Sequence, residues 1–241
     1  GGEGGVPTIF VAAANATEQS QATADYVCTG SPNDDGRTIQ KAIDELNNLA
    51  PNRGRLVLSE GRFDCNTGMQ FNQDGHTVQG MGKLATDVRI KGTPATDFFL
   101  FDFGGLGDYN TIRDLTIEDD SIPAAGINIT GIRFGGENNT VENLRVMDIG
   151  ASCTGGGIGS GISVQGVQNV VSNCAVVPGT GYGIWVSADY NKIQDCVFNI
   201  WQGGTERGLF VDASVGSEIV NNFFLGWDSS GTGDAMLLDG C

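Results

Sequence analysis

The sequence is poor in basic residues and in histidine. It has 13 Lys and Arg residues against 29 Asp and Glu residues, a net charge of −16, and one histidine. Nucleic-acid binding needs a basic surface that neutralises phosphates, so nucleic acid is excluded as a partner. Polyanionic sugars would also be repelled unless a cation bridges them. Neutral glycans, metal ions and other proteins remain as partner classes.

Long apolar runs and zinc-binding motifs are also missing. No stretch of 18 apolar residues occurs, so we predict no membrane insertion. Six cysteines are present, but no two are spaced as C-x-x-C, and His76 is the only histidine. A zinc site is therefore not predicted. We predict no cofactor and no metal ion, and calcium is not predicted either.

What the sequence does contain is a repeat of 22 to 30 residues. Each copy has a small polar residue, then a branched apolar residue, then Asn or Asp, then a second apolar residue. The copies are 110–117, 139–146, 169–176, 191–198 and 217–224. Self-similarity at this period indicates a stacked, quasi-one-dimensional fold.

A second strand-like series recurs in phase with the first. It consists of the segments GIRF from Gly131, GISV from Gly161, GIWV from Gly183, GLFV from Gly208 and AMLL from Ala235. Both series alternate with period 2 and are separated by turn residues. No amphipathic stretch of helical length lies in the unit, so helical repeats are disfavoured.

These two series predict an all-β solenoid, a right-handed parallel β-helix of roughly five clear coils. Equivalent strands of successive coils would pair at the spacing of about 4.8 Å. The central apolar residues would stack into one buried column, and the Asn or Asp residues would stack at the bend beside it. These two columns are Ile112, Val141, Val171, Ile193 and Ile219, and Asp114, Asn143, Asn173, Asp195 and Asn221. Cys174 and Cys196 would stack as buried free thiols, because their side chains point the same way.

An N-terminal cap precedes the repeats. Residues 34–49 predict the one clear helix, with an apolar stripe that would close the end of the solenoid. We assign residues 1–6 to a Gly-rich linker, 7–54 to a strand and helix cap, and 55–241 to the β-helix. The GGEGG start and the strand-like end lead us to expect a piece of a larger, oligomeric assembly.

The cap carries a family resemblance. The run ADYVCTGSPNDDGRTIQKAIDEL (24–46), followed by GRLVLSEGRFDC (54–65), resembles the N-terminal signature of the pectate-lyase-like β-helix superfamily. The opening TIFVAAANATEQSQATADYVC (8–28) resembles the version found in minor tail proteins and tailspikes of tailed bacteriophages. One fold of this kind hosts lyases, hydrolases and inert binding shafts, so the resemblance implies the fold more strongly than an activity.

The resemblance implies a structural phage tail protein, a minor tail protein or tailspike segment that contributes to host attachment. It further implies a homotrimer, contacts with other virion tail proteins and a host-surface glycan, and a place on the virion, outside the cell after release. The alternatives are a carbohydrate-active enzyme, either a polysaccharide lyase or a glycoside hydrolase, and a capsid-surface or S-layer adhesin. The chain lacks the N-T-D and G-H-G segments of polygalacturonases, which leads us toward a protein that is not an enzyme.

Two groups of residues are the candidates for function. If the chain is an enzyme, the densest carboxylates are Glu118, Asp119 and Asp120, although acidic turns are usually only solvated loops. The aromatic residues of neighbouring coils are the candidates for glycan binding, namely Tyr182, Trp185, Tyr190 and Trp201. Alternation buries Ile184 and Val186 and turns Trp185 outward. The unequal repeat steps place extra loop at 118–130 and 147–160, where we expect any speciality.

Overall fold

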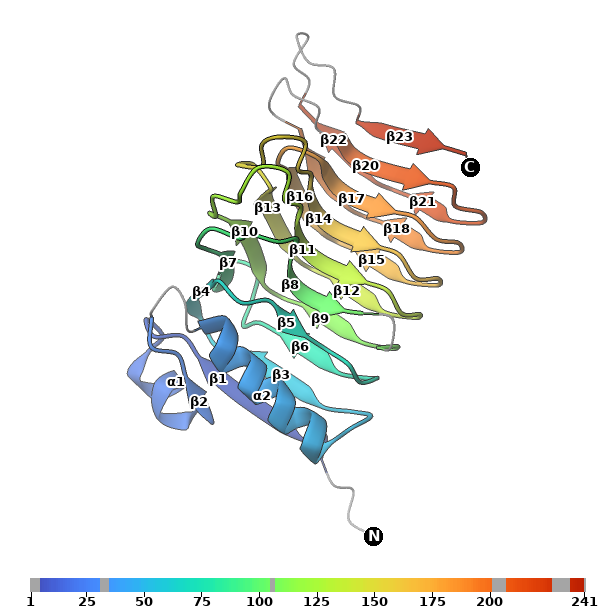
Figure 1. Cartoon of the computed structure of the whole chain (residues 1–241). Coiled ribbons are helices and arrows are strands. Elements are labelled where there is room, and N and C mark those ends of the chain that lie inside the picture. Colours follow the sequence, from blue (N-terminus) through green and yellow to red (C-terminus); the bar gives the residue numbers. More distant parts are fainter. Residues whose placement is uncertain (1–4, 31–34, 105–106, 201–206, 227–234, 241) are drawn as a thin grey trace.

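The protein is a stack of short strands. The computed structural model describes residues 5–30, 35–104, 107–200, 207–226 and 235–240. The strands rise in regular coils from a helical cap, and the two ends of the chain lie at opposite ends of the stack (Figure 1). This confirms the predicted all-β solenoid with an N-terminal α-helical cap.

Three parallel sheets run along the stack. Sheet A contains, in spatial order, β2 (Tyr26–Val27), β1 (Thr8–Ala12), β3 (Arg55–Leu58), β6 (Thr77–Gln79), β9 (Thr111–Arg113), β12 (Thr140–Glu142), β15 (Val170–Ser172), β18 (Lys192–Gln194) and β21 (Glu218–Val220). Sheet B contains β4 (Gly61–Cys65), β7 (Thr86–Ile90), β10 (Thr116–Asp119), β13 (Arg145–Ile149), β16 (Ala175–Pro178), β19 (Val197–Asn199) and β22 (Phe223–Leu225). Sheet C contains β5 (Met69–Gln70), β8 (Phe98–Phe103), β11 (Ile129–Phe134), β14 (Gly159–Val164), β17 (Tyr182–Val186), β20 (Arg207–Asp212) and β23 (Met236–Asp239).

The described strands form seven coils of a right-handed parallel β-helix, from β3–β5 to β21–β23. The repeat pattern indicates only about five, because the first two coils lack its Asn or Asp. In the second coil Gly80 follows β6 where later coils have a turn Asn or Asp. The apolar column nevertheless continues through both coils, since Leu56 is in register with Val78 and Val78 with Ile112. The strand pairing therefore starts earlier than the sequence signature.

The interior is filled by columns of equivalent side chains. The predicted column of sheet A is fully buried from Leu56 through Val171, and Ile219 is partly buried in the last coil. Beneath sheet C, phenylalanines stack through three coils. The Phe71 and Phe103 ring centroids are 4.5 Å apart, and those of Phe103 and Phe134 are 4.9 Å apart.

The predicted Asn and Asp ladder lies at the bend between sheets A and B. All five of its residues have a positive φ, between 53° and 60°. Asn and Asp tolerate this left-handed conformation better than most residues because their side chains bond locally. The side chains also join coils, since Asn143 Nδ2 donates to Asp114 Oδ1 at 2.7 Å. The bend is therefore built by the residues that the repeat pattern identifies.

A second ladder, of buried asparagines, lies at the bend between sheets C and A. Each Asn side chain accepts the backbone N–H of the equivalent residue one coil earlier. Asn110 N–H donates to Asn139 Oδ1, Asn139 N–H to Asn169 Oδ1, and Asn169 N–H to Asn191 Oδ1, all at 2.8 Å. These amide oxygens satisfy backbone donors that would otherwise be buried without a partner. The first residue of the repeat is thus a structural position.

We expect Asn139→Ala to destabilise the fold by about 1–3 kcal/mol, because the buried Asn110 N–H loses its acceptor. The free energy of unfolding in urea measures the change, and hydrogen exchange at the Asn110 amide should speed up. Asn52→Ala is the control, since Asn52 is exposed and lies outside the ladder. Equal costs for the two variants would contradict a structural role for the ladder.

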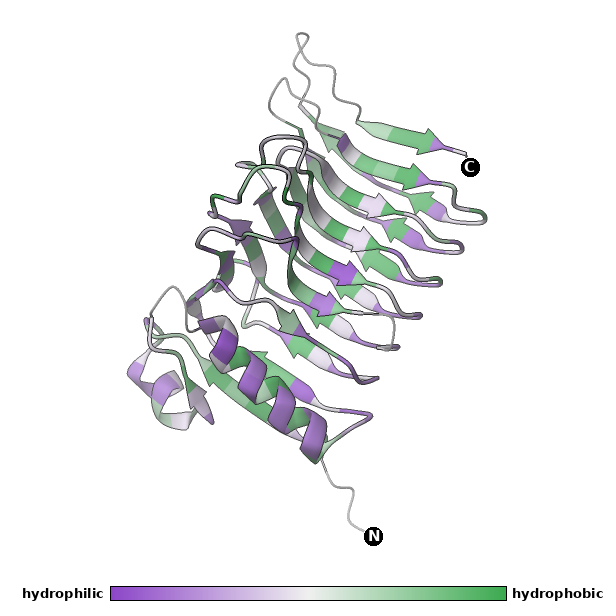
Figure 2. Ribbon diagram, in the orientation of Figure 1, coloured by the Kyte–Doolittle hydropathy of each residue, from purple (hydrophilic) through white to green (hydrophobic). Residues whose placement is uncertain are grey.

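The cap combines two helices with two strands. α2 (Asp35–Leu49) buries Ile39, Ile43 and Leu46 and contacts β1, β3, β4 and β5. Its outer side is hydrophilic over the hydrophobic strands beneath it (Figure 2). α1 (Glu18–Thr23) is short, and Thr17 caps it by accepting the Ser20 N–H. α2 therefore covers the first coil, as predicted for the helix expected at residues 34–49.

Glycine recurs at one position of sheet C for lack of space. A Cβ built on Gly131 would lie 2.6 Å from the Gly161 carbonyl oxygen, and one on Gly161 would lie 2.5 Å from that of Gly183. The glycine that opens four of the five companion segments is thus required by a close approach between coils, and only the last segment opens with alanine, Ala235. The sequence predicts that the Gly-rich run 155–161 is only a loop between coils. Its last three residues instead belong to β14.

The five described cysteines, Cys28, Cys65, Cys153, Cys174 and Cys196, are free and buried. Burial raises the pKa of the Cys28 thiol well above its usual value. In the described part of the chain, neither helix has the length and apolar character needed to cross a lipid bilayer.

His76 takes the place of asparagine at the start of the buried ladder. Its backbone N–H donates to Asn110 Oδ1 at 2.8 Å, and its side chain is completely buried beside Gly54. Neither ring nitrogen has a hydrogen-bond partner of normal geometry among the described residues. Burial lowers the pKa of His76 below its usual 6.5, because the charged imidazolium is poorly solvated there.

We therefore expect stability to fall in mild acid. The unfolded chain takes up a proton near pH 6.5 while the folded chain keeps His76 neutral, so stability is lost as the pH falls from 6.5 through the folded-state pKa. The loss is at most about 1.4 kcal/mol per pH unit for one proton. Urea melts at several pH values measure it, and NMR of this single histidine reports its pKa directly. His76→Asn should remove this part of the pH dependence, and an unchanged slope would contradict the assignment.

Candidate functional site

A groove of about 400 Å³ crosses the outer face of sheet C. It lies over β8, β11, β14, β17 and β20, which follow one another along the stack in Figure 1. The groove is lined by side chains that point outward from these strands. The residues next to them along the chain point inward and are buried in the core. Ile184 and Val186, for example, are fully buried, and Trp185 between them lines the groove. The outward orientation predicted for Trp185 is confirmed.

Aromatic rings dominate one part of this groove. Tyr182 stacks on Phe210 of the next strand, with ring centroids 4.8 Å apart, and lies 6.0 Å from Trp185. Trp185 and Phe210 occupy equivalent positions of adjacent strands. The Arg207 guanidinium lies over Phe210, 5.3 Å from the ring centroid. These rings form a continuous platform across two coils.

The indole nitrogen of Trp185 is an unsatisfied donor. It is buried and has no hydrogen-bond partner among the described residues. Leaving such a donor unpaired costs free energy that a ligand hydroxyl can recover. Small polar residues lie beside it, because Ser160 and Ser163 of the neighbouring coil line the groove and Gln165 Nε2 donates to Ser163 Oγ at 3.2 Å. Because the serine side chains are short, the groove is deeper next to the aromatic platform.

A partly buried ion pair borders the other end of the groove. Arg133 Nε and Nη2 donate to the two carboxylate oxygens of Asp102 at 2.8 and 2.7 Å. The Arg133 guanidinium also lies 3.9 Å from the centroid of the Phe99 ring, which lines the groove. The fork geometry holds Arg133 in one orientation, so Phe99 is fixed as a second aromatic contact.

Polar groups from two loops complete the rim. Asp97 accepts the Asn128 N–H at 2.9 Å, and Asn128 Oδ1 accepts the Ile158 N–H at 2.9 Å. Asn128 and Ile158 belong to the loops that lengthen two of the repeats. Both residues line the groove with Asp97. The longer loops thus contribute a rim, whereas the strands contribute the rings.

The predicted glycan-binding residues lie in different places. Tyr182 and Trp185 come together in the groove. Tyr190 lies at the bend between sheets C and A, with a φ of 57° and its ring against Gly216. Trp201 lies outside the described residues. Two further aromatic residues of the groove, Phe99 and Phe210, are not among the residues predicted from the sequence.

Each missed ring has a sequence signal. Phe210 has the same place in GLFV that Trp185 has in GIWV, so comparing the copies of the repeat position by position identifies it. Phe99 lies in the second coil, which the repeat pattern did not include.

The predicted catalytic carboxylates lie on or next to a different sheet. Glu118 is on the outer face of sheet B, where its Oε2 lies 2.9 Å from Arg89 Nη2. Asp120 forms an ion pair with Lys91, and the hydrogen bond from Lys91 lowers the pKa of Asp120. Glu118 lines a smaller pocket of about 310 Å³ with Arg89, Lys83 and Arg145. Both of these carboxylates are therefore partnered by cations.

Asp119 is partly buried and links two loops. It accepts the Ser121 N–H and, from the next coil, the Gly150 N–H, both at 2.8 Å. Burial raises the pKa of the Asp119 carboxyl, although these two hydrogen bonds act in the opposite direction and lower it. Its contacts are those of a turn acceptor, and its catalytic role stays a sequence-based prediction. Among the described residues, no cluster of three or more His, Cys, Asp or Glu side chains is arranged to hold a metal ion.

No family model matches this sequence, and no curated protein matches it. Several solved structures resemble it at low identity. A candidate glycosyl hydrolase from Parabacteroides merdae is 16% identical, with a TM-score of 0.47 over 78% of this chain and 89% of the other. Alginate lyase from Paenibacillus is 13% identical, with a TM-score of 0.40 over 97% and 99%. Pectin methylesterase from carrot is 13% identical, with a TM-score of 0.41 over 100% and 86%.

Likenesses at this level carry no activity or substrate over to this chain, because one fold of this kind supports many functions. The fold itself rests on the three parallel sheets described above. The chain is therefore a right-handed parallel β-helix.

Proposed function

We propose that this protein binds a polysaccharide along the outer face of sheet C. The observation that carries the proposal is the groove in which Tyr182, Trp185 and Phe210 form a platform beside serine and glutamine side chains. The apolar C–H face of a pyranose ring buries well against an aromatic ring, and its hydroxyls need hydrogen-bond partners at the edges. The unpaired Trp185 Nε1–H supplies one such donor.

A neutral polysaccharide is the ligand we favour. The chain has a net charge of −16, and the carboxylates of Asp97 and Asp212 line the groove. A polyanion would be repelled by this field, whereas a neutral chain of sugars would not. The strands of the groove belong to successive coils, so sugar units can follow one another along the axis of the β-helix.

Binding to defined polysaccharides tests the proposal. The purified protein is run through gels that contain neutral glucans, mannans or galactans, or acidic alginate or pectate, and its retardation is measured. We expect retardation by at least one neutral polymer, together with a change in tryptophan fluorescence. Retardation by acidic polymers alone, or by none of the set, would contradict the neutral-glycan proposal.

Cleavage of the bound polysaccharide is a second candidate function. Asp212 lines the groove, and the register of β20 with β23 places Asp239 at the equivalent position of the next coil. Equivalent positions of neighbouring strands lie about 4.8 Å apart, close to the separation of about 5–5.5 Å used by retaining glycosidases. Two carboxylates at this spacing are a minimal requirement for such an enzyme.

Product analysis separates cleavage from binding. New reducing ends or unsaturated products are measured for the unchanged protein and for three variants. Loss of turnover in Asp212→Asn alone would support catalysis in the groove. Loss in Asp119→Asn or Asp120→Asn would instead support the carboxylates predicted from the sequence. Binding without any turnover would leave the protein as a glycan-binding shaft.

Attachment of a phage tail to its host is the setting that the N-terminal segment 8–28 favours for this glycan binding. The homotrimer and the contacts with other virion proteins are part of the same proposal. Large apolar side chains of the last coil, such as Phe223 and Leu238, are more than half exposed, which supports packing against another surface. Immunogold labelling of intact particles tests the location, and light scattering tests the trimer. Label absent from purified particles would contradict the tail assignment.

A further inference from the structure

The groove on sheet C has aromatic rings toward both of its ends, and the register of the strands relates them to each other. Four of its lining residues come from successive strands, namely Phe99, Thr130, Ser160 and Tyr182. Each of them is in register with the next one on the adjacent strand. They therefore form one row along the axis of the β-helix, with a ring at each end and two hydroxyl groups between.

The row sets the separation between its two rings. Adjacent strands lie about 4.8 Å apart, so three strand spacings, or about 14 Å, separate the backbone of Phe99 from that of Tyr182. A single pyranose ring is shorter than this distance and cannot stack on both rings. A ligand that uses both ends of the row must therefore be a chain of sugars that runs straight along the groove.

Both rings are held in place by their neighbours. At one end, the Arg133 guanidinium lies 3.9 Å from the centroid of the Phe99 ring, and two hydrogen bonds to Asp102 hold Arg133. At the other end, Tyr182 stacks on Phe210, with ring centroids 4.8 Å apart. Side chains that are already fixed lose little conformational freedom when a ligand stacks on them. Both ends of the row are therefore prepared for binding.

The middle of the groove is polar but uncharged. Thr130, Ser160 and Ser163 are buried residues that line it. A hydroxyl group both donates and accepts hydrogen bonds, so these side chains can pair with the hydroxyls of a sugar in either direction. A floor of this kind suits neutral sugar units between the two aromatic contacts.

We propose that the groove binds an extended, neutral β-1,4-linked glycan, in a segment of at least four sugar units. Successive sugars of such a chain are separated by about one strand spacing. One unit stacks on Phe99, two lie over the hydroxyl groups, and a fourth stacks on Tyr182. A polymer that coils, such as an α-1,4-linked glucan, curves away from a straight row before it reaches the second ring. This inference rests on the proposed function and names the class of its ligand.

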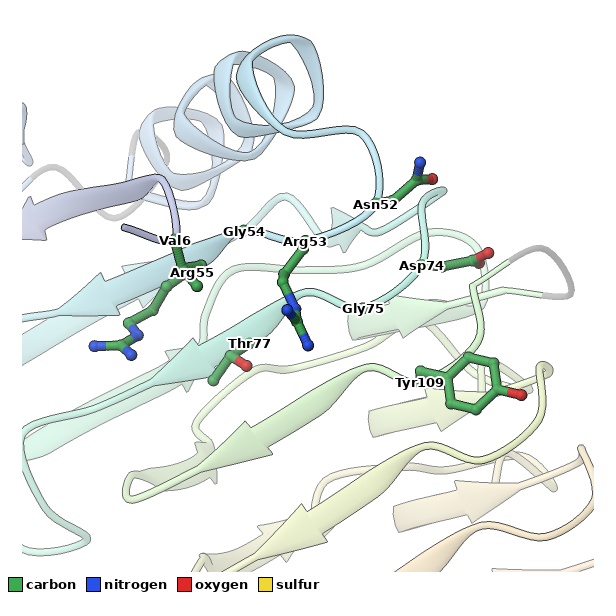
Figure 3. Close-up of a pocket in the computed structure, with 9 residues that line it drawn as sticks. All are labelled: Val6, Asn52, Arg53, Gly54, Arg55, Asp74, Gly75, Thr77 and Tyr109. Carbon is green, nitrogen blue, oxygen red and sulfur yellow. The ribbon is translucent and has the colours of Figure 1, made fainter. Parts of the chain in front are cut away.

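The groove between the end of α2 and the bend between sheets C and A lacks this arrangement (Figure 3). It has a volume of about 470 Å³, and Tyr109 is the one aromatic ring among the described residues that line it. The side chains of Arg53 and Arg55 point apart in Figure 3. A single ring cannot hold an extended chain at two points, so Tyr109 serves as a control.

Titration with oligosaccharides of increasing length tests the proposal. The probes are β-1,4-linked oligomers of glucose, of mannose and of xylose with two to six units, and tryptophan fluorescence reports binding. For at least one sugar we expect the affinity to rise by about tenfold or more between two and five units and then to level off, because only the longer oligomers reach both rings. An affinity that stops rising at two units would overturn the inference. Equally tight binding of the α-1,4-linked glucose hexamer would also overturn it.

The outcome is distinguishable from failure of the proposed function. If neutral polymers retard the protein in gels but no β-1,4-linked oligomer binds, the inference on the ligand class fails and glycan binding stands. If neither the polymers nor the oligomers bind, both fail.

Variants assign the length dependence to the row. Phe99→Ala should weaken binding of the six-unit oligomer by about tenfold, to near the affinity of the unchanged protein for three units. Tyr109→Ala is the matched control, because Tyr109 is a 64% exposed aromatic residue outside the groove on sheet C, and it should leave binding unchanged. A thermal melt of each variant shows whether the fold is intact. A loss in Phe99→Ala no greater than in Tyr109→Ala would overturn the two-ended site.

Discussion

Phe103→Ala is expected to destabilise the protein by about 3–5 kcal/mol, because it opens a cavity in the middle of the aromatic column. Phe103 is fully buried and lies between Phe71 and Phe134, with ring centroids 4.5 and 4.9 Å away. It is joined to coils on both sides, so its removal loosens three successive coils at once. Adjacent coils of a solenoid stabilise one another mainly through such interfaces.

Urea denaturation followed by circular dichroism measures this loss. Phe99→Ala is the matched control, because Phe99 is on the same strand but points outward into the groove and is only partly buried. We expect it to cost clearly less than Phe103→Ala. Phe103→Leu should recover most of the stability, since it keeps an apolar group of moderate size. A cost for Phe103→Ala no greater than for Phe99→Ala would contradict a column that supports the fold.

Trp185→Ala is expected to weaken polysaccharide binding by at least about 30-fold, which corresponds to about 2 kcal/mol. Trp185 lies at the centre of the platform, 6.0 Å from Tyr182 and in register with Phe210. Its removal takes away both the stacking surface and the Nε1–H donor. This prediction rests on the proposed function and is measured by affinity electrophoresis with a polymer that retards the unchanged protein.

Two controls make the Trp185 result specific. Tyr190→Ala removes an aromatic ring of the adjacent turn that does not line the groove, and it should leave the affinity unchanged. Trp185→Phe keeps a ring without the N–H donor, so an intermediate loss is expected. A thermal melt of each variant shows whether the fold is intact. Equal losses for Tyr190→Ala and Trp185→Ala would indicate that sheet C does not bind the glycan.

The repeat pattern predicted the architecture because parallel stacking imposes the same environment on every coil. Ile112, Val141 and Val171 must each fit the same buried position, and Asp114, Asn143 and Asn173 must each adopt a positive φ. A requirement that recurs every 22 to 30 residues is visible in the sequence itself. The cap helix was predictable for a similar reason, since one apolar stripe is needed to cover the first coil.

The repeat pattern does not predict the first two coils, because these coils meet the same requirements on turns and core with other residues. His76 stands where the later coils have asparagine, and Gly80 stands where they have a turn Asn or Asp. Close packing against the neighbouring coil explains Gly80, as a Cβ there would lie 2.4 Å from the Asp114 carbonyl oxygen. Pairing by backbone hydrogen bonds does not depend on these side chains, so the sheets continue where the motif stops.

For the candidate site, alternation along one strand predicted that Trp185 faces outward and Ile184 inward. It could not show that the rings of Phe210 and Tyr182 would stack there, because the two residues lie on different coils and the contact depends on how their side chains pack in the folded groove. The carboxylates Glu118 to Asp120 are adjacent in sequence yet reach different surroundings. Glu118 pairs with Arg89, Asp119 accepts the Gly150 N–H and Asp120 pairs with Lys91.

A capped parallel β-helix follows from the amino-acid sequence alone, because every coil repeats the same local requirements on turns and core. The position of the grooves follows from the folded arrangement of the coils and not from any one segment. The platform of Tyr182, Trp185 and Phe210 depends on the register between coils. A surface site combines one or two residues from each of several coils, so no single segment carries its pattern.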